Sequence, residues 1–285
     1  MANRRRDQPD PMLTANEQVQ SAASLAAQAN PWHQAYGVLI EHFGPQHWWP
    51  GETPFEVMLG AVLTQNTAWS NVEKAVANLR TAGALNCCAI LNLTEHQLAE
   101  FIRPTGYFNV KARRLNALCA FLEKRGVAET PERLGDGTDA AVLRHALLTV
   151  HGIGEETADS ILLYALGLPV FVVDAYTRRI FTRLGRLEGR ESYAQVQNLF
   201  EANLPKDVRM YNEYHALIVR LGKDVCRPRP RCTLCPLQQE CPSVPRLTHP
   251  PSCLRLVKGV RRGVSPTERQ RRRQPDRNRR VGVPR

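Results

Sequence analysis

Four cysteines near the C-terminal end of the folded region have a spacing that suits a metal centre. They follow the pattern C-x5-C-x2-C-x5-C and are Cys226, Cys232, Cys235 and Cys241. Structural zinc usually binds two separate Cys or His pairs across a longer loop, whereas four thiolates around a compact centre suit a 4Fe-4S cluster. We therefore expect these cysteines to hold a 4Fe-4S cluster, with zinc or unligated thiols as the alternatives.

A single carboxylate, Asp174, follows an apolar run over residues 168–173 and precedes a polar helical pattern. An aspartate that is partly removed from water, in a cleft, is a candidate acid or base. Aspartate is also a favoured helix N-cap, and Arg178 and Arg179 lie within the next turn or so. Both roles can belong to one side chain.

A glycine hairpin over residues 150–154 separates two stretches with apolar residues at helical spacing. Gly152 and Gly154 allow a tight turn and a close approach by another backbone. The amides that open the second helix are then free to meet a phosphate, an anion that the helix dipole favours. Such a contact holds DNA without reading its sequence. The alternative is that the hairpin only links two packed helices.

Helical patterns must position these residues, because the only clear β-branched run, residues 170–173, is short. The sequence therefore predicts an all-α protein. The expected helices begin near Pro31 and then cover Phe55–Asn66, Asn71–Ala82, Asn92–Ile102, Lys111–Lys124 and Thr138–Leu148, with a short turn at Pro131–Leu134.

The composition bounds the class of protein. A chain of 285 residues with 43% hydrophobic content can bury one large or two modest cores. It contains no run of eighteen apolar residues, and its N-terminus lacks an apolar signal core. We expect a cytoplasmic protein without a membrane partner, in a reducing compartment where disulfides are rare.

The net charge of +11 is concentrated in one stretch. Residues 255–285 hold twelve Lys or Arg against two acidic residues and therefore carry ten of the eleven charges. This tail lacks apolar periodicity, so we expect it to be disordered and to add at most non-specific phosphate affinity. A DNA-binding face on the remaining chain must be a local patch.

Several motifs resemble the helix-hairpin-helix DNA glycosylase superfamily, specifically its endonuclease III branch. The resemblance covers roughly residues 31–245 and is carried by residues 148–154, Thr157-Ala158, Val173-Asp174, Phe55-Glu56, Gln65-Asn66 and residues 106–112. It implies two helical domains with a DNA cleft between them, where Asp174 would sit. The implied organisation is a flexible extension (1–30), a cluster domain (31–54 and 166–245), a six-helix barrel domain with the hairpin (55–165) and the basic tail (246–285).

The resemblance also implies an activity and its residues. A glycosylase must flip the damaged base out of double-stranded DNA before its N-glycosidic bond can be hydrolysed. Asp174 would be the catalytic carboxylate, and Gln65 or Asn66 would fill the vacated space. The other residues expected to contact DNA are His151, Gly152, Gly154, Lys111 and Arg229. The protein is expected to be a monomer. The family carries a 4Fe-4S cluster at this place, with one more residue between its first two cysteines.

One position departs from the family pattern. Members that also nick the strand use a lysine just before Thr157, where this chain has Glu156, and no lysine occurs between Lys124 and Lys206. A monofunctional glycosylase is therefore expected. The alternatives are a bifunctional glycosylase/AP lyase for oxidised pyrimidines, with its amine supplied from elsewhere, and a non-catalytic DNA-binding protein on the same fold.

Aromatic residues near the first barrel helix suggest a base pocket. Trp48, Trp49 and Phe55 could stack on a cationic alkylated purine. Together with the missing lysine, this stretch is similar to the 3-methyladenine glycosylases of the endonuclease III-like group. The alternative is that these aromatic residues only pack the core.

Overall fold

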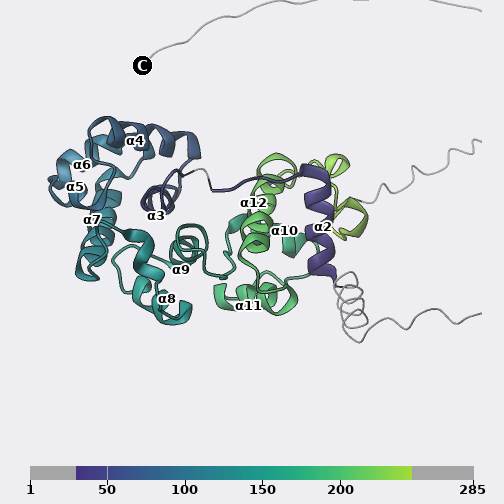
Figure 1. Cartoon of the computed structure of the whole chain (residues 1–285). Helices are drawn as coiled ribbons and strands as arrows, with labels where there is room; N and C mark the ends of the chain where they lie inside the picture. The colour runs from purple at the N-terminus through teal and green to yellow at the C-terminus, as the bar shows by residue number, and fades with distance from the viewer. Residues whose placement is uncertain (1–29, 50, 246–285) are drawn as a thin grey trace, which may run out of the picture. The chain divides into compact units, whose positions relative to one another are not determined.

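The computed structural model describes residues 30–49 and 51–245, and all regular structure in these ranges is helical (Figure 1). The all-α prediction is confirmed. The α-helices are α2 (Pro31–Phe43), α3 (Pro54–Leu63), α4 (Trp69–Thr81), α5 (Cys87–Leu91), α6 (Glu95–Phe101), α7 (Phe108–Lys124), α8 (Ala140–Leu148), α9 (Glu155–Ser160), α10 (Ala175–Arg183), α11 (Tyr193–Asn203) and α12 (Val208–Asp224). The shorter elements are η1 (Arg103–Thr105), η2 (Pro131–Gly135), η3 (Ile161–Ala165), η4 (Cys232–Leu234) and η5 (Gln238–Glu240).

Two helix starts differ from the expectation. The helix predicted over Asn92–Ile102 begins later, at Glu95, because the side chain of Thr94 caps it and Gln97 completes a capping box, and the short helix α5 precedes it. Asn30, which we expected in the flexible extension, caps α2 by accepting the N–H of Trp32 and donates to the carbonyl of Asn203 at 2.8 Å. The rest of that extension and the basic tail lie outside the described residues, so those predictions stay untested.

Two hydrophobic clusters form the core of the unit that ends at Val244. Buried residues of α3 to α9 form the first, which is mainly aliphatic. The second gathers α2 with α10, α11 and α12 and is rich in aromatic rings. α2 joins it although it lies far away in the sequence, since Tyr214 donates to the carbonyl of Trp32 at 2.8 Å and Trp32 stacks on Phe181. The domain boundaries given above remain a prediction.

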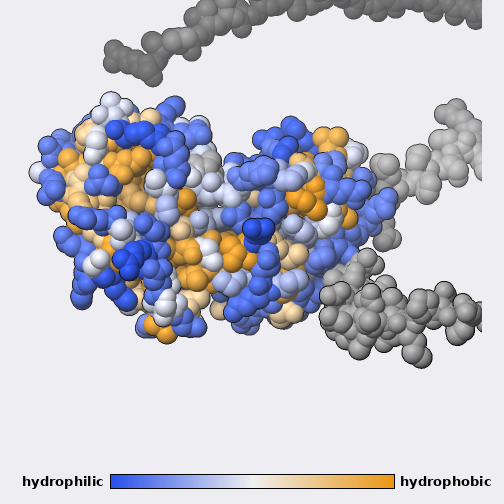
Figure 2. Space-filling model, in the orientation of Figure 1, coloured by the Kyte–Doolittle hydropathy of each residue, from blue (hydrophilic) through white to orange (hydrophobic). Residues whose placement is uncertain are grey.

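The clusters meet where the second hairpin helix continues as the π-helical turn η3. On the face drawn in Figure 2, hydrophobic residues reach the surface near α9 within a mostly hydrophilic surrounding. After η3 the chain turns at Gly167, which has a φ of +64°, and continues without helix or strand to Asp174. Phe171, Val172 and Val173 are buried in this segment, as their apolar run predicts.

In the described part of the chain, no helix is both long enough and apolar enough to span a membrane.

Candidate functional site

Asp174 is the N-cap of α10, and only 8% of its surface is exposed. Its Oδ1 accepts two hydrogen bonds from Thr177, one from the backbone N–H at 2.7 Å and one from Oγ1 at 2.8 Å. Among the described residues, Oδ2 has no hydrogen-bond donor, and Nε2 of His215 lies 3.7 Å away. One oxygen therefore fixes the start of the helix, while the other accepts no hydrogen bond from the described residues.

His215 connects Asp174 to a tyrosine. Its Nδ1 and the hydroxyl of Tyr164 are hydrogen-bonded, whereas its buried Nε2 has no hydrogen-bond partner among the described groups. Burial lowers the pKa of His215, an effect that the Asp174 charge only partly opposes. A neutral imidazole whose Nδ1 accepts a hydrogen bond from the hydroxyl of Tyr164 carries its N–H at Nε2, which lies near Oδ2 of Asp174.

Glu156 lies in the first turn of α9 and is exposed to solvent. Surrounding protein nevertheless raises its pKa to about 7, and the Asp174 carboxylate adds to that shift. The two carboxyl groups therefore interact electrostatically. A side chain that titrates near neutrality fits the edge of a reactive site better than a simple solvated helix start.

A row of aromatic rings connects Trp48, which precedes α3, with His215. The ring of Trp49 lies 5.3 Å from that of Trp69, at right angles, and 5.2 Å from that of Tyr164. Trp48 packs 5.5 Å from Trp49, and the indole N–H groups of both are buried without a hydrogen-bond partner. The predicted pocket residues Trp48 and Trp49 thus lie in one half-buried group with Trp69 and Tyr164.

Phe55 does not belong to this group in the structure. It is a buried member of the first hydrophobic cluster, in the opening turn of α3, where Thr53 caps the helix and Pro54 begins it. Because its ring is used for packing, the prediction that Phe55 lines the base pocket is not supported by its position.

The hairpin leaves the start of α9 open. Gly152 has a φ of +82°, and a side chain there would collide with Arg114. Gly154 is the N-cap of α9 and provides no side-chain cap, and a Cβ at this position would meet nothing within 4 Å. His151 is exposed beside these glycines. The first amides of α9 therefore have room for an anion.

Gln65 lies against the hairpin, just beyond the end of α3. Its Nε2 donates to Oγ1 of Thr157 at 2.9 Å and to the carbonyl of Gly152 at 3.3 Å, and its Oε1 accepts from Arg114. Asn66 is exposed and has a left-handed φ of +55°. The structure thus brings the two candidate plug residues next to the glycine turn.

Lys111 cannot serve as the exposed phosphate contact that we expected. The residue is 1% exposed, and its ammonium donates to the carbonyls of Leu63 at 2.9 Å and Thr105 at 2.8 Å. Burial, helped by Arg114, lowers its pKa to about 8. Lys111 instead satisfies carbonyls at the end of α3 and in η1. The loop it supports presents Tyr107, which is 74% exposed with a left-handed φ of +47°.

Cys226, Cys232, Cys235 and Cys241 carry free thiols and line one cavity of about 40 Å³. Arg179 and Arg183 of α10 hold the first of these residues, since both donate to the carbonyl of Cys226 and Nη1 of Arg183 lies 3.3 Å from its Sγ. Arg229 is exposed in the loop that follows Cys226. Four thiols around one cavity fit a thiolate-ligated centre.

A family model describes more than half of this chain. Residues 59–206, which include the hairpin, Glu156 and Asp174, match the HhH-GPD superfamily base excision DNA repair protein family. The chain belongs to this superfamily. A relative from Methanocaldococcus jannaschii, provisionally named a DNA repair glycosylase, is 46% identical over 209 residues, which are 73% of this chain and 94% of the relative.

Solved structures of HhH-GPD proteins show the same fold. The 3-methyladenine DNA glycosylase of H. pylori bound to 1,N6-ethenoadenine matches with a TM-score of 0.54 and 30% identity, over 74% of this chain and 98% of that one. An endonuclease III–DNA complex matches with a TM-score of 0.61 and 24% identity, over 81% and 97% of the two chains. The expected superfamily, all-α fold and enzyme class, a DNA N-glycosylase, are confirmed.

Three residues of the candidate site were missed by sequence reasoning. His215, Tyr164 and Trp69 lie on separate helical elements, and only the packing of those elements brings them near Asp174 and Trp49. A buried histidine on the apolar face of α12 was a weak signal, because such a residue is more often part of a core than of a site.

Proposed function

We propose that this HhH-GPD protein is a monofunctional DNA glycosylase that acts as a monomer and hydrolyses the N-glycosidic bond of an alkylated purine in double-stranded DNA. The observation that carries the proposal is the position of Asp174, whose free Oδ2 lies at the end of the aromatic row formed by Trp49, Tyr164 and His215. A base stacked on the row would bring its sugar toward a carboxylate.

Asp174 would act on the sugar. Breaking the glycosidic bond builds positive charge on the sugar ring, and a carboxylate held in place beside that charge stabilises the transition state. Thr177 occupies Oδ1, so Oδ2 faces the sugar or accepts the proton of the attacking water. His215, as a neutral donor near Oδ2, would orient this oxygen or the water between them.

The aromatic group would receive the flipped base. Indole and phenol rings stack on any base, and their electron-rich faces favour a purine that carries positive charge after alkylation. The unpartnered indole N–H groups of Trp48 and Trp49 supply donors for purine edge atoms. The H. pylori relative, which is a 3-methyladenine glycosylase, supports this choice of substrate class.

The hairpin and the end of α3 would hold the DNA around the flipped nucleotide. The open amides of α9 suit a phosphate, and Gln65 lies beside them in position to enter the vacated stack. His151 and Asn66, the sequence neighbours of Gly152 and Gln65, are both exposed. Tyr107 adds an exposed ring that can stack on neighbouring bases.

The position of the family lysine offers no amine for a lyase step. Glu156 stands at the position of the family lysine, and residues 125–205 contain no lysine. Lys111 is buried with its ammonium bound to two carbonyls, which leaves it unable to attack a sugar. The product would therefore be an abasic site with an intact strand.

We also propose that Cys226, Cys232, Cys235 and Cys241 hold a 4Fe-4S cluster. The four thiols line one cavity. Four thiolates around a compact centre suit a 4Fe-4S cluster, whereas structural zinc usually binds two separate Cys or His pairs across a longer loop. The contribution of the cluster would be to fold the loop that carries Arg229 near the DNA backbone.

The glycosylase proposal is tested with methylated duplex DNA. Purified protein should release methylated purines and leave abasic sites that break only after alkali, whereas Asp174→Asn should release almost none. Release of no modified base from alkylated or oxidised duplexes would contradict the proposal. For the cluster, a brown protein with about four irons per chain is expected; a colourless protein with one zinc would contradict it.

A further inference from the structure

The segment that ends at Asp174 is buried but has no strand to pair with. Phe171, Val172 and Val173 are at most 2% exposed, and residues 167–174 form neither helix nor strand. Buried backbone N–H and C=O groups need hydrogen-bond partners, and residues 171–173 make no backbone–backbone hydrogen bond with other described residues. Side chains must therefore satisfy this backbone.

One face of α11 supplies these partners. Glu201 accepts the N–H of Phe171 at 2.8 Å, Gln197 donates to the carbonyl of Phe171 at 2.7 Å, and the hydroxyl of Tyr193 accepts the N–H of Val173 at 3.1 Å. We call Tyr193, Gln197 and Glu201 the α11 stripe. They are spaced at i, i+4 and i+8 and thus lie on one side of the helix, running in the opposite direction to the segment.

The spacing of the stripe matches the spacing of an extended chain. Four helical residues rise about 6 Å, and two extended residues span about 6.6 Å. Gln197 and Tyr193 are four residues apart, and the groups they hold belong to Phe171 and Val173, two residues apart. The spacing therefore favours one register, because the N–H and C=O groups of the next residue in an extended chain point to the opposite edge.

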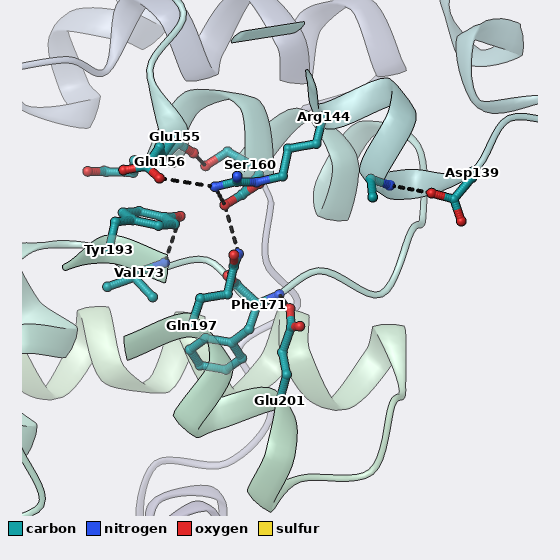
Figure 3. A network of polar contacts seen from close by, with 12 residues as sticks. Asp139, Arg144, Glu155, Glu156, Ser160, Phe171, Val173, Tyr193, Gln197 and Glu201 are labelled. Carbon is teal, nitrogen blue, oxygen red and sulfur yellow. Dashed lines mark hydrogen bonds and ion pairs between the residues drawn. The ribbon is translucent and has the colours of Figure 1, made fainter. Parts of the chain in front are cut away.

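A buried ion pair connects the stripe to the hairpin helices (Figure 3). Asp159 of α9 is fully buried and accepts two hydrogen bonds from Arg144 of α8, at 2.6 and 3.1 Å. Gln197 also donates to Asp159 at 2.8 Å, so one amide group bridges α9 and the carbonyl of Phe171. The guanidinium of Arg144 lies 5.7 Å above the ring of Tyr193.

The protonation states of this network determine which groups donate and which accept hydrogen bonds. Burial, and next the Asp159 charge, raises the pKa of Tyr193, so its hydroxyl stays protonated and can donate toward Asp159 while it accepts from Val173. The hydrogen bond with Asp159 raises the pKa of Arg144, so the ion pair stays charged. Each member has a fixed role as donor or acceptor, which makes the arrangement rigid.

We propose that Tyr193 and Gln197 are positioning residues that fix Asp174 relative to the DNA-binding hairpin through the Arg144–Asp159 pair. This inference rests on the proposed function of Asp174. The hairpin sets where the sugar lies, because it holds the flanking phosphate, and the stripe sets where the carboxylate lies. A displacement of about 1 Å between reacting groups can cost 10²-fold in rate, so this register matters for catalysis.

The test compares conservative variants that remove one group each. Tyr193→Phe removes the acceptor for Val173, and Gln197→Met removes the bridging amide. We expect single-turnover base release to fall about 10-fold for Tyr193→Phe and about 100-fold for Gln197→Met. Affinity for a duplex with a tetrahydrofuran abasic analogue should stay within about twofold of wild type, because the hairpin is unchanged.

Tyr211→Phe is the matched control. Tyr211 packs against Phe171 at 5.4 Å, but its buried hydroxyl has no hydrogen-bond partner among the described groups. Loss of this hydroxyl should leave both base release and DNA affinity as in wild type. In an Asp174→Asn background, Tyr193→Phe should cause no further loss of rate, since its effect passes through the carboxylate.

Amide hydrogen exchange gives a readout that does not depend on activity. The amides of Phe171, Val173 and Thr177 should exchange faster in Gln197→Met and Tyr193→Phe than in Tyr211→Phe. Unchanged exchange, unchanged base release, or a loss of DNA affinity as large as the loss of rate would overturn the inference. A wild-type protein that releases no base would defeat the proposed function, and the exchange result would still decide whether the stripe holds the segment.

Discussion

Two helices begin near the candidate site, and they begin in opposite ways. α9 starts at Gly154 without a side-chain cap, whereas α10 starts at Asp174, whose Oδ1 accepts the N–H of Thr177 at 2.7 Å. The first start leaves amides open to an anion. The second closes them with one oxygen of a carboxylate and leaves the other oxygen 3.7 Å from Nε2 of His215.

The difference separates two tasks that one reaction needs. The open start suits the negative phosphate of the DNA strand, and the carboxylate of the closed start suits the positive charge that develops on the sugar. Their supports differ as well. Gly152 makes room for Arg114 by lacking a side chain, while the segment before Asp174 is held by the side chains of α11.

The largest expected effect on base release comes from removing the charge of Asp174 at the start of α10. Asp174→Asn should reduce single-turnover base release about 10³-fold, because the carboxylate no longer stabilises the sugar cation. Asparagine caps helices as well as aspartate does, so the melting temperature should be unchanged. Asp174→Ala, which loses the cap too, should cost about 1 kcal/mol of stability in denaturant unfolding. Near wild-type rates for Asp174→Asn would show that the chemistry lies elsewhere.

The converse change adds a side-chain cap to the start of α9. Gly154→Asp places a carboxylate at the start of α9, where a Cβ meets no neighbour. Affinity for undamaged and abasic duplexes should fall about 10-fold or more in fluorescence anisotropy, because the new side chain occupies the amides and repels phosphate. Gly154→Ala is the control, which adds a Cβ without a charge. Equal affinities for the Asp and Ala variants would refute an anion role for this helix start.

The aromatic rings near the start of α10 should contribute to recognition of the flipped base and not to binding of the DNA backbone. Trp49→Leu removes the ring that packs 5.2 Å from Tyr164. Base release from methylated duplexes should fall about 10-fold, in line with about 1–3 kcal/mol for one stacked base. Binding to undamaged duplex should change little. Phe55→Leu is the comparison, since Phe55 is buried in the core and should alter stability without altering selectivity.

A smaller, pH-dependent effect is expected at Glu156, which lies between the two starts. Its pKa is raised from 4.5 to about 7, so the folded protein holds this proton more tightly than the unfolded chain does. Wild type should therefore lose stability relative to Glu156→Gln as the pH rises from 4.5 to 7. Melting curves of both proteins over this range measure the difference. A constant difference at all pH values would mean that Glu156 is not perturbed.

Local rules predicted part of this site. The glycine spacing predicted the hairpin, and the residue types around Asp174 predicted its role as an N-cap. The contacts of Lys111 could not be predicted, because the sequence around this residue does not show that the carbonyls of Leu63 and Thr105 need a buried donor. His215 and Tyr164 were hidden for a related reason, since their meeting depends on how α12 packs against η3.

The most direct test of the central claim is borohydride trapping on a duplex whose lesion wild-type protein removes. The account predicts base release with an intact strand and no covalent adduct, because Glu156 replaces the amine and Lys111 is buried. Glu156→Lys, measured in parallel, provides an amine at the family position and serves as the positive control for trapping. A borohydride-trapped adduct with the wild-type protein, or strand breaks without alkali, would contradict a monofunctional enzyme.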